Sequence, residues 1–276
     1  MSAPLVSICI PHFEVAELMQ VCLRSIRKHT QDVPIEVIVV DNGSRDDSLD
    51  YLRSLRWIRL IETDNRTWPY NVFQAWDLGV RAAQGEYVLT MHSDVFIRRD
   101  GWLRPYLERI QEAPEVAAVG GWKLTEPSLT RALYEWQKHV FGTALSALKS
   151  LFGRKRVIRW RRLRFPRDYA GLYRRSVLLE HDLSFLPRPV GAPIPQGEGG
   201  GYAISQRLWD LGFSTRMIPL RTMAANMVHI AHGTSAFVAA RRRSRAGAQR
   251  DVEETAASLF REPWVQALCV ATELDD

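Results

Sequence analysis

The chain has 276 residues, 46% of them hydrophobic and 25% charged, so it is long enough to bury a core as one large or two small domains. This composition is close to the globular average and argues against disordered, collagen-like and coiled-coil proteins. Its three cysteines have no CxxC spacing, which excludes a disulfide framework or a cysteine-rich zinc module and favours a reducing compartment. No apolar run approaches the roughly 18 residues that span a bilayer, and the first one is too short for a signal peptide.

The net charge of +6 is concentrated in one segment. Residues 154–167 contain eight basic residues and no acidic ones, and the rest of the chain has 29 basic residues against 31 acidic. An apolar stripe from Leu133 to Phe152 runs directly into this basic segment. The stripe is typical of core or homodimer packing, whereas the combination over residues 130–167 is also typical of a helix on an anionic membrane surface. Apart from this basic segment, no part of the sequence resembles a nucleic-acid-binding module, so no nucleic-acid partner is expected.

Strands and helices alternate through the first 121 residues. Apolar runs predict strands at Leu5–Ile10, Ile35–Val40, Trp57–Ile61, Tyr87–Met91 and Val116–Val119. Helical spacing predicts helices over 15–26, 44–55, 72–80 and 103–110, the second opened by a capping box of Ser44 and Asp47. This alternation predicts a parallel sheet with right-handed crossovers.

The second half of the chain is less regular. A Pro/Gly-rich loop over 188–201 precedes a helix-like stretch that begins at Tyr202 and is ended by Gly212. A short apolar stretch, MVHI, leads into His232-Gly233-Thr234, and the last 40 residues are expected to be peripheral.

Polar residues follow four of the predicted strands, where an open parallel sheet binds its ligands. They are the segments PHFE (11–14), DNGS (41–44), TDNR (63–66) and HSD (92–94). The chain lacks GxGxxG after its first strand and also lacks GxxxxGK[ST] and GxSxG, which disfavours dehydrogenases, P-loop triphosphatases and serine hydrolases. Two aspartates on neighbouring loops suit a nucleotide and a divalent cation.

Three segments in this order resemble the family-2 glycosyltransferases of the GT-A fold: VSICIPHFE, VIVVDNGSRDDS and GEYVLTMHSDVFIRRDGWL. The resemblance covers about residues 4–121 and, more loosely, 165–235. It implies an α/β fold of GT-A type, with a mostly parallel sheet flanked by helices. The implied organisation is a nucleotide-sugar-binding half (1–121), an acceptor-binding half (122–235) carrying the amphipathic and basic insertion 130–167, and a C-terminal peripheral segment (236–276).

The resemblance also implies a set of nucleotide-binding residues. Pro11 and Phe13 match the turn beside the base and ribose, and Glu14 stands where the family often has Asn. Asp41 matches a carboxylate that accepts a hydrogen bond from the base. Asp77 replaces an Asn in a helical segment near the nucleotide, and TWPYNVFQ replaces the glycine-rich stretch that usually follows Asn65.

A metal site is implied by the segment that matches the family's D-x-D signature. His92, Ser93 and Asp94 take its three positions, so Asp94 is the expected ligand of Mn²⁺ or Mg²⁺, and His92 and Ser93 are expected beside the nucleotide. A further ligand in the family is a late histidine. Both His229 and His232 match this position, and the sequence does not choose between them.

The catalytic base is harder to place. Inverting transfer needs a group that takes the proton of the acceptor hydroxyl, and the family supplies it in an acidic pair ahead of D-x-x-x-R. Gly200 and Gly201 stand at the position of that pair here. Glu198 is therefore the candidate base, with Asp182 as the alternative.

These residues predict an inverting, hexosyltransferase-like enzyme that moves a sugar from a UDP-linked donor to a glycan or lipid-linked acceptor, using a divalent metal. His92 and the displaced acidic pair leave a catalytically silent nucleotide-sugar-binding protein as one alternative. A peripheral membrane scaffold acting through residues 130–167 is another. The expected location is cytoplasmic, or peripheral at the inner face of the membrane.

Overall fold

The computed structural model describes residues 3–122, 165–186, 200–238 and 246–276, together with isolated positions 124, 137, 140, 141, 144 and 148. The predicted base Glu198 and most of the predicted insertion 130–167 lie outside the described residues. Among the helices that are described, none is both long and apolar enough to cross a membrane.

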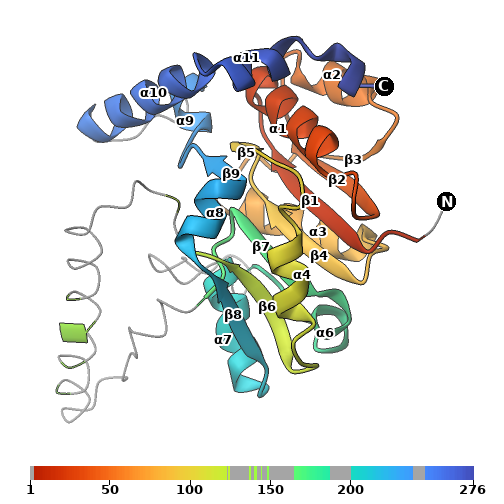
Figure 1. Ribbon diagram of the computed structural model, residues 1–276, viewed down its shortest axis with the longest axis vertical. Helices are drawn as coiled ribbons and strands as arrows, with labels where there is room; N and C mark the ends of the chain where they lie inside the picture. Colours follow the sequence, from red (N-terminus) through yellow and green to blue (C-terminus); the bar gives the residue numbers. More distant parts are fainter. Residues whose placement is uncertain are drawn as a thin grey trace.

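Seven strands form the central sheet (Figure 1). They are β1 (Val6–His12), β2 (Ile35–Asn42), β3 (Ile58–Thr63), β4 (Tyr87–Met91), β6 (Val116–Gly121), β7 (Ala170–Arg174) and β8 (Ser214–Ile218). Their order is β3-β2-β1-β4-β7-β6-β8, and only β7 runs antiparallel to its neighbours. The five predicted strands and the mostly parallel sheet are thus confirmed.

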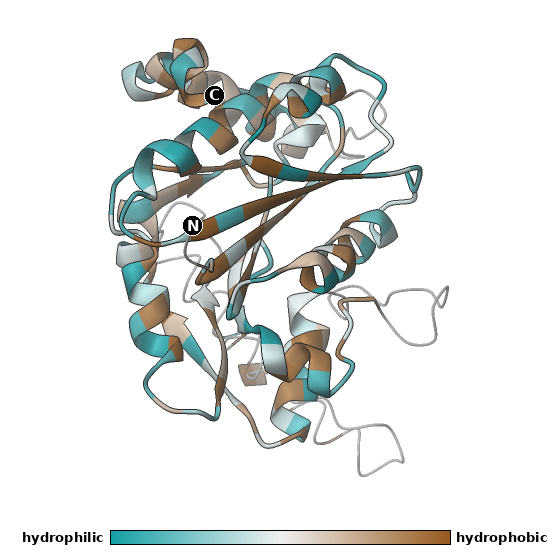
Figure 2. Cartoon of the chain, turned by 90° about the vertical axis from the view of Figure 1, so that its right-hand side faces the viewer, coloured by the Kyte–Doolittle hydropathy of each residue, from teal (hydrophilic) through white to brown (hydrophobic). Residues whose placement is uncertain are grey.

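Helices cover both faces of this sheet. One face carries α1 (Ala16–His29), α2 (Ser48–Ser54) and α4 (Arg104–Ile110), and the same core extends to α10 (Ala246–Phe260) and α11 (Pro263–Val270). The other face carries α3 (Tyr70–Ala82), α6 (Arg175–Glu180) and α7 (Gly201–Asp210). Ile8 and Ile10 pack into the first layer and Cys9 into the second, because successive side chains of a strand point to opposite faces. Figure 2 shows the resulting hydrophobic strands between helices of mixed hydropathy.

A second, two-stranded sheet pairs β5 (Val95–Ile97) with β9 (Met227–His229) in antiparallel register. Around it lie α8 (Leu220–Asn226) and α9 (Thr234–Phe237), and the chain closes with the short helix η3 (Thr272–Leu274). This small sheet matters for function, because it joins the segment after β4 to a segment late in the chain.

The predicted capping box at the start of the second helix is wrong. α2 begins at Ser48, four residues beyond Ser44. The Ser44 hydroxyl donates to Asp41 Oδ1 instead, and its oxygen accepts a hydrogen bond from the Glu14 backbone N–H. The side chain is used to tie two loops together, which competes with helix capping.

The segment expected at the periphery contributes to the core. Val265 and Leu268 of α11 are buried against α1. Arg24 of α1 donates two hydrogen bonds to the Asp275 carboxylate, at 2.6 and 2.9 Å. It donates two more to the backbone carbonyls of Leu268 and Cys269. A buried guanidinium with four acceptors fixes this end of the chain to the sheet layer.

Candidate functional site

The site lies where β1 and β4 separate. β1 pairs with β4 only as far as Cys9 and Thr90, while it continues beside β2 until His12 faces Asp41. Pro11 is tolerated in this extension because the proline lies beyond the last pairing with β4. The divergence leaves the ends of β1, β2, β3 and β4 along one edge of the sheet, as the sequence predicted.

Three side chains with metal-binding atoms converge at the end of β4. One ligand atom from each of His92, Asp94 and His229 lies within 4.8 Å of those of the other two. Asp94 Oδ1 is 3.3 Å from His229 Nε2 and 3.7 Å from His92 Nδ1. The small sheet brings them together, because His229 of β9 is paired with Val95 of β5, the residue after Asp94.

The facing atoms of this cluster lack other partners. Asp94 Oδ1 and His229 Nε2 are buried, and among the described residues each has no partner within hydrogen-bonding distance other than the other. The second carboxylate oxygen, Asp94 Oδ2, accepts the Gly233 backbone N–H at 2.8 Å. Burial alone would raise the pKa of Asp94, but His229, His92 and the Gly233 N–H together hold it below its usual range. Two buried ligand atoms that face each other and have no further hydrogen-bond partner fit a cation.

Aromatic rings fix the orientation of both histidines. Trp76 stacks on His92 with ring centroids 5.5 Å apart, and Tyr169 stacks on His229 at 4.6 Å. Burial lowers the pKa of His92 to about 4, against the opposing effect of Asp94, so its imidazole is neutral at pH 7. A neutral imidazole is the form that binds a metal.

The structure shows which of the two late histidines, His229 or His232, lies in the cluster, a choice that the sequence left open. His229 belongs to the cluster, whereas His232 is exposed in the turn before α9, with φ of 70°. Gly233 packs directly beneath Asp94, since a Cβ at this position would lie 2.8 Å from the Asp94 Cβ. A glycine is therefore required next to the carboxylate.

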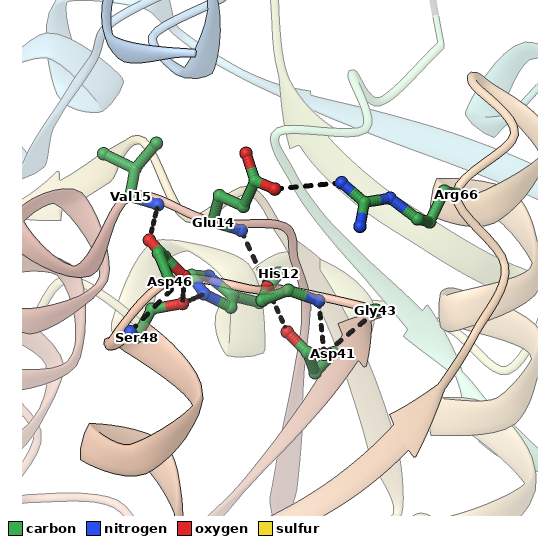
Figure 3. Close-up of polar contacts among 9 residues, drawn as sticks. His12, Glu14, Val15, Asp41, Gly43, Asp46, Ser48 and Arg66 are labelled. Carbon is green, nitrogen blue, oxygen red and sulfur yellow. Dashed lines mark hydrogen bonds and ion pairs between the residues drawn. The ribbon is translucent and has the colours of Figure 1, made fainter. Parts of the chain in front are cut away.

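Asp41 is buried and holds its own loop (Figure 3). Its Oδ2 accepts the backbone N–H groups of Gly43 and Ser44, each at 3.0 Å. This arrangement turns the chain sharply at the end of β2, with Gly43 at φ 78°. The predicted contact between Asp41 and a base stays a prediction, and its observed role is to shape the loop.

A second set of contacts joins this loop to the end of β1. Asp46 accepts hydrogen bonds from the Ser48 hydroxyl and from the Val15 backbone N–H (Figure 3). The same Ser48 hydroxyl lies 2.8 Å from Nε2 of His12. His12 is 1% exposed and its Nδ1 has no hydrogen-bond partner among the described residues. Burial lowers its pKa to about 4, although Asp41 and Asp46 act in the opposite direction.

Glu14 and Phe13 both meet an arginine from the loop after β3. Arg66 Nη2 is 3.0 Å from Glu14 Oε1 (Figure 3). The same guanidinium lies 4.9 Å from the centroid of the Phe13 ring. Glu14 and Val15 both have positive φ, 54° and 64°. Such strained backbone in non-glycine residues clusters at functional sites.

Two other predicted residues are engaged elsewhere. Asp77 accepts hydrogen bonds from the Ser184 hydroxyl and the Phe185 backbone N–H, so it fixes the turn after α6. Asn65 donates a hydrogen bond to the Gln74 side chain in α3 and accepts one from the Thr67 backbone N–H in its own loop. The nucleotide roles of Asp77, Asn65 and Ser93 stay predictions, as does the role of Asp182, which is exposed after α6.

Several residues of the site were not identified from the sequence. Trp76 falls within the predicted helix over 72–80, and the sequence offered no functional reason to select it, Tyr169 or Gly233. The one available signal was the HG dipeptide after an apolar stretch, which marks a tight turn but not its partner. Their roles depend on contacts across the fold.

Comparisons with known proteins agree with this geometry. The family model "Glycosyl transferase family 2" matches residues 7–181. EpsH of Bacillus subtilis (strain 168) is 26% identical over 204 residues, which is 67% of this chain and 51% of EpsH. A "PGL/p-HBAD biosynthesis glycosyltransferase" of Mycobacterium tuberculosis (strain ATCC 25618 / H37Rv) is 34% identical over 98 residues, 34% of this chain and 37% of that protein. The chain thus spans about half of EpsH.

Among solved structures, the fold is similar to the mannosyltransferase PcManGT from Pyrobaculum calidifontis, whose structure contains GDP-Man and Mn²⁺. The TM-score is 0.55 at 20% identity, covering 98% of this chain and 74% of that one. Glucosyl-3-phosphoglycerate synthase from Mycobacterium tuberculosis has a TM-score of 0.52 at 15% identity, covering 96% and 80%. These likenesses support the GT-A fold.

Proposed function

Since the chain belongs to glycosyltransferase family 2, we propose that it transfers a sugar, with inversion, from a nucleotide-sugar to an acceptor hydroxyl in the presence of a divalent metal. The observation that carries this proposal is the cluster of His92, Asp94 and His229 at the end of β4. Its two buried ligand atoms, Asp94 Oδ1 and His229 Nε2, have no hydrogen-bond partner within the described residues other than each other.

The cluster leaves room in a metal's coordination shell for the oxygens of a diphosphate. One carboxylate and two imidazoles are three ligands, and Mn²⁺ accepts this mixture as readily as Mg²⁺. A bound cation neutralises charge on the leaving nucleoside diphosphate. The Mn²⁺ in the structure of PcManGT supports manganese as the metal bound by this cluster.

The loops after β1, β2 and β3 are proposed to hold the nucleoside. Phe13 offers an aromatic face under Arg66, and Glu14 fixes that arginine from the side. Asp41 acts by holding Gly43 and Ser44 in a tight turn whose backbone borders the same edge of the sheet. We take UDP as the donor nucleotide, as the sequence predicted, with GDP as the competing choice because PcManGT binds GDP-Man.

A membrane-bound or dimeric form receives no support from the described residues. The acceptor, glycan or lipid-linked, and the cytoplasmic location stay predictions.

Isothermal titration with UDP or GDP, each with and without Mn²⁺, tests the proposal. We expect nucleotide binding that depends on Mn²⁺, and a loss of at least about tenfold in affinity, about 1.4 kcal/mol, in Asp94→Asn. Asp100→Asn is the matched control, because Asp100 is exposed and pairs with His29 rather than with a residue of the cluster. If the wild type binds neither nucleotide, or if Asp94→Asn binds unchanged, the assignment is rejected.

A further inference from the structure

The sequence left the catalytic base without a clear position, and the fold places a carboxylate there from another segment. Asp168 lies in the loop before β7, and its carboxylate sits against the first residues of α7. Gly201, the first residue of α7, donates its backbone N–H to Asp168 Oδ1 at 2.7 Å. Gly200 and Gly201 are the positions at which an acidic pair was sought in the sequence.

The two glycines form a cradle that the carboxylate fills. A Cβ on Gly200 would lie 2.3 Å from Asp168 Oδ2, and a Cβ on Gly201 would lie 2.2 Å from Oδ1. No side chain at either position is compatible with Asp168 as it stands, since real Cβ atoms do not approach oxygen this closely. Gly200 also has φ of 61°, which a side chain would strain. The position of the Asp168 carboxylate therefore requires glycine at both 200 and 201.

The loop that carries Asp168 borders the metal cluster. The next residue, Tyr169, stacks on His229, and its carbonyl accepts the His92 backbone N–H at 3.1 Å. On the other side, the Cβ position of Gly200 is 2.9 Å from Phe73, whose ring neighbours Trp76, the residue stacked on His92. Two chains of neighbouring residues thus link Asp168 to the cluster, one through Tyr169 and one through Gly200, Phe73 and Trp76.

The surroundings of Asp168 suit proton transfer. Burial raises its pKa to about 6, while the Gly201 N–H and the Arg167 guanidinium act in the opposite direction. The Tyr173 hydroxyl, on β7, faces the same cradle, 3.0 Å from the Cβ position of Gly201. A carboxylate of this kind is ionised at neutral pH and is more basic than an exposed one, which is the requirement for a general base.

We propose that Asp168 is the general base of the transfer reaction. Its carboxylate takes the proton of the acceptor hydroxyl as that oxygen forms a bond to the anomeric carbon. The bond between this carbon and the phosphate oxygen breaks, and the nucleoside diphosphate leaves with the electron pair. The assignment rests on the proposed function and replaces Glu198 and Asp182 in this role.

The test is hydrolysis of UDP-glucose and GDP-mannose in the presence of Mn²⁺, in which water takes the place of the acceptor, measured beside nucleotide binding by titration. Asp168→Asn keeps an oxygen that accepts the Gly201 N–H, so its melting temperature should stay close to that of the wild type. We expect it to bind UDP or GDP with wild-type affinity and to lose at least about 100-fold in kcat. The acidic limb of the wild-type pH profile, near the pKa of about 6, should disappear with it.

Two comparison variants sharpen the result. Asp210→Asn, at the exposed far end of α7, should hydrolyse donor like the wild type. Glu198→Gln should retain activity, whereas a loss confined to this variant would overturn the proposal in favour of Glu198. Retention of kcat within about threefold in Asp168→Asn would also overturn it. Absence of both binding and hydrolysis in the wild type would instead refute the proposed function, and the assignment of Asp168 with it.

Discussion

Acidification should destabilise this protein through His12, a buried histidine at the end of β1. Its pKa is about 4 in the folded state and about 6.5 when the chain is unfolded. Because the folded pKa is the lower one, the unfolded state binds the proton first. The contribution of neutral His12 to stability is therefore complete above pH 6.5 and is lost as the pH falls from about 6.5 towards 4.

The size of the effect follows from these two values. At pH 5 the unfolded histidine is almost fully protonated and the folded one is about one-tenth protonated. The free energy of unfolding should then be lower by about 2 kcal/mol than at pH 7.5, on the basis of about 1.4 kcal/mol for each pH unit between the two pKa values. The partner of His12 Nε2 is the Ser48 hydroxyl, which a glutamine amide can also contact.

Urea unfolding of the wild type and His12→Gln at pH 7.5 and pH 5 measures this contribution. The variant should lose about 2 kcal/mol less than the wild type between the two pH values. Other titrating groups, including His92, affect both proteins alike and cancel in the comparison. Equal losses in the two proteins would refute the reasoning, because they would mean that His12 is not kept neutral by burial.

Two further predictions follow from the site and from the C-terminal segment. His229→Ala should weaken the dependence of nucleotide binding on Mn²⁺ by at least about tenfold, while His232→Ala should leave it unchanged. Titration of both variants checks this. A larger loss in His232→Ala than in His229→Ala would contradict the cluster. Asp275→Ala should lower the free energy of unfolding by about 3 kcal/mol, because it leaves the buried Arg24 guanidinium without its anion. Asp276→Ala, at the exposed neighbouring residue, is the control in chemical denaturation, and similar losses in both variants would argue against this role of Arg24.

The strands and the edge of the site could be predicted from residues that are close in sequence. Continuous apolar runs such as Ile35–Val40 predict buried strands because a strand covered on both faces has no polar positions. Asp94 is the third residue after one of these runs, Tyr87–Met91, so its place at the edge of the sheet was predictable. The start of α2 was not predictable, because the Ser44 hydroxyl can either cap the helix or donate a hydrogen bond to Asp41.

The sequence by itself determined the alternation of strands and helices, the polar residues at the strand ends and the family to which they point, because each depends on local pattern. Only the tertiary structure decided that His229 rather than His232 joins Asp94, since this depends on the pairing of β5 with β9. It also decided that the carboxylate beside Gly200 and Gly201 comes from Asp168. Groups distant in the chain meet through packing and strand register, which no local pattern encodes.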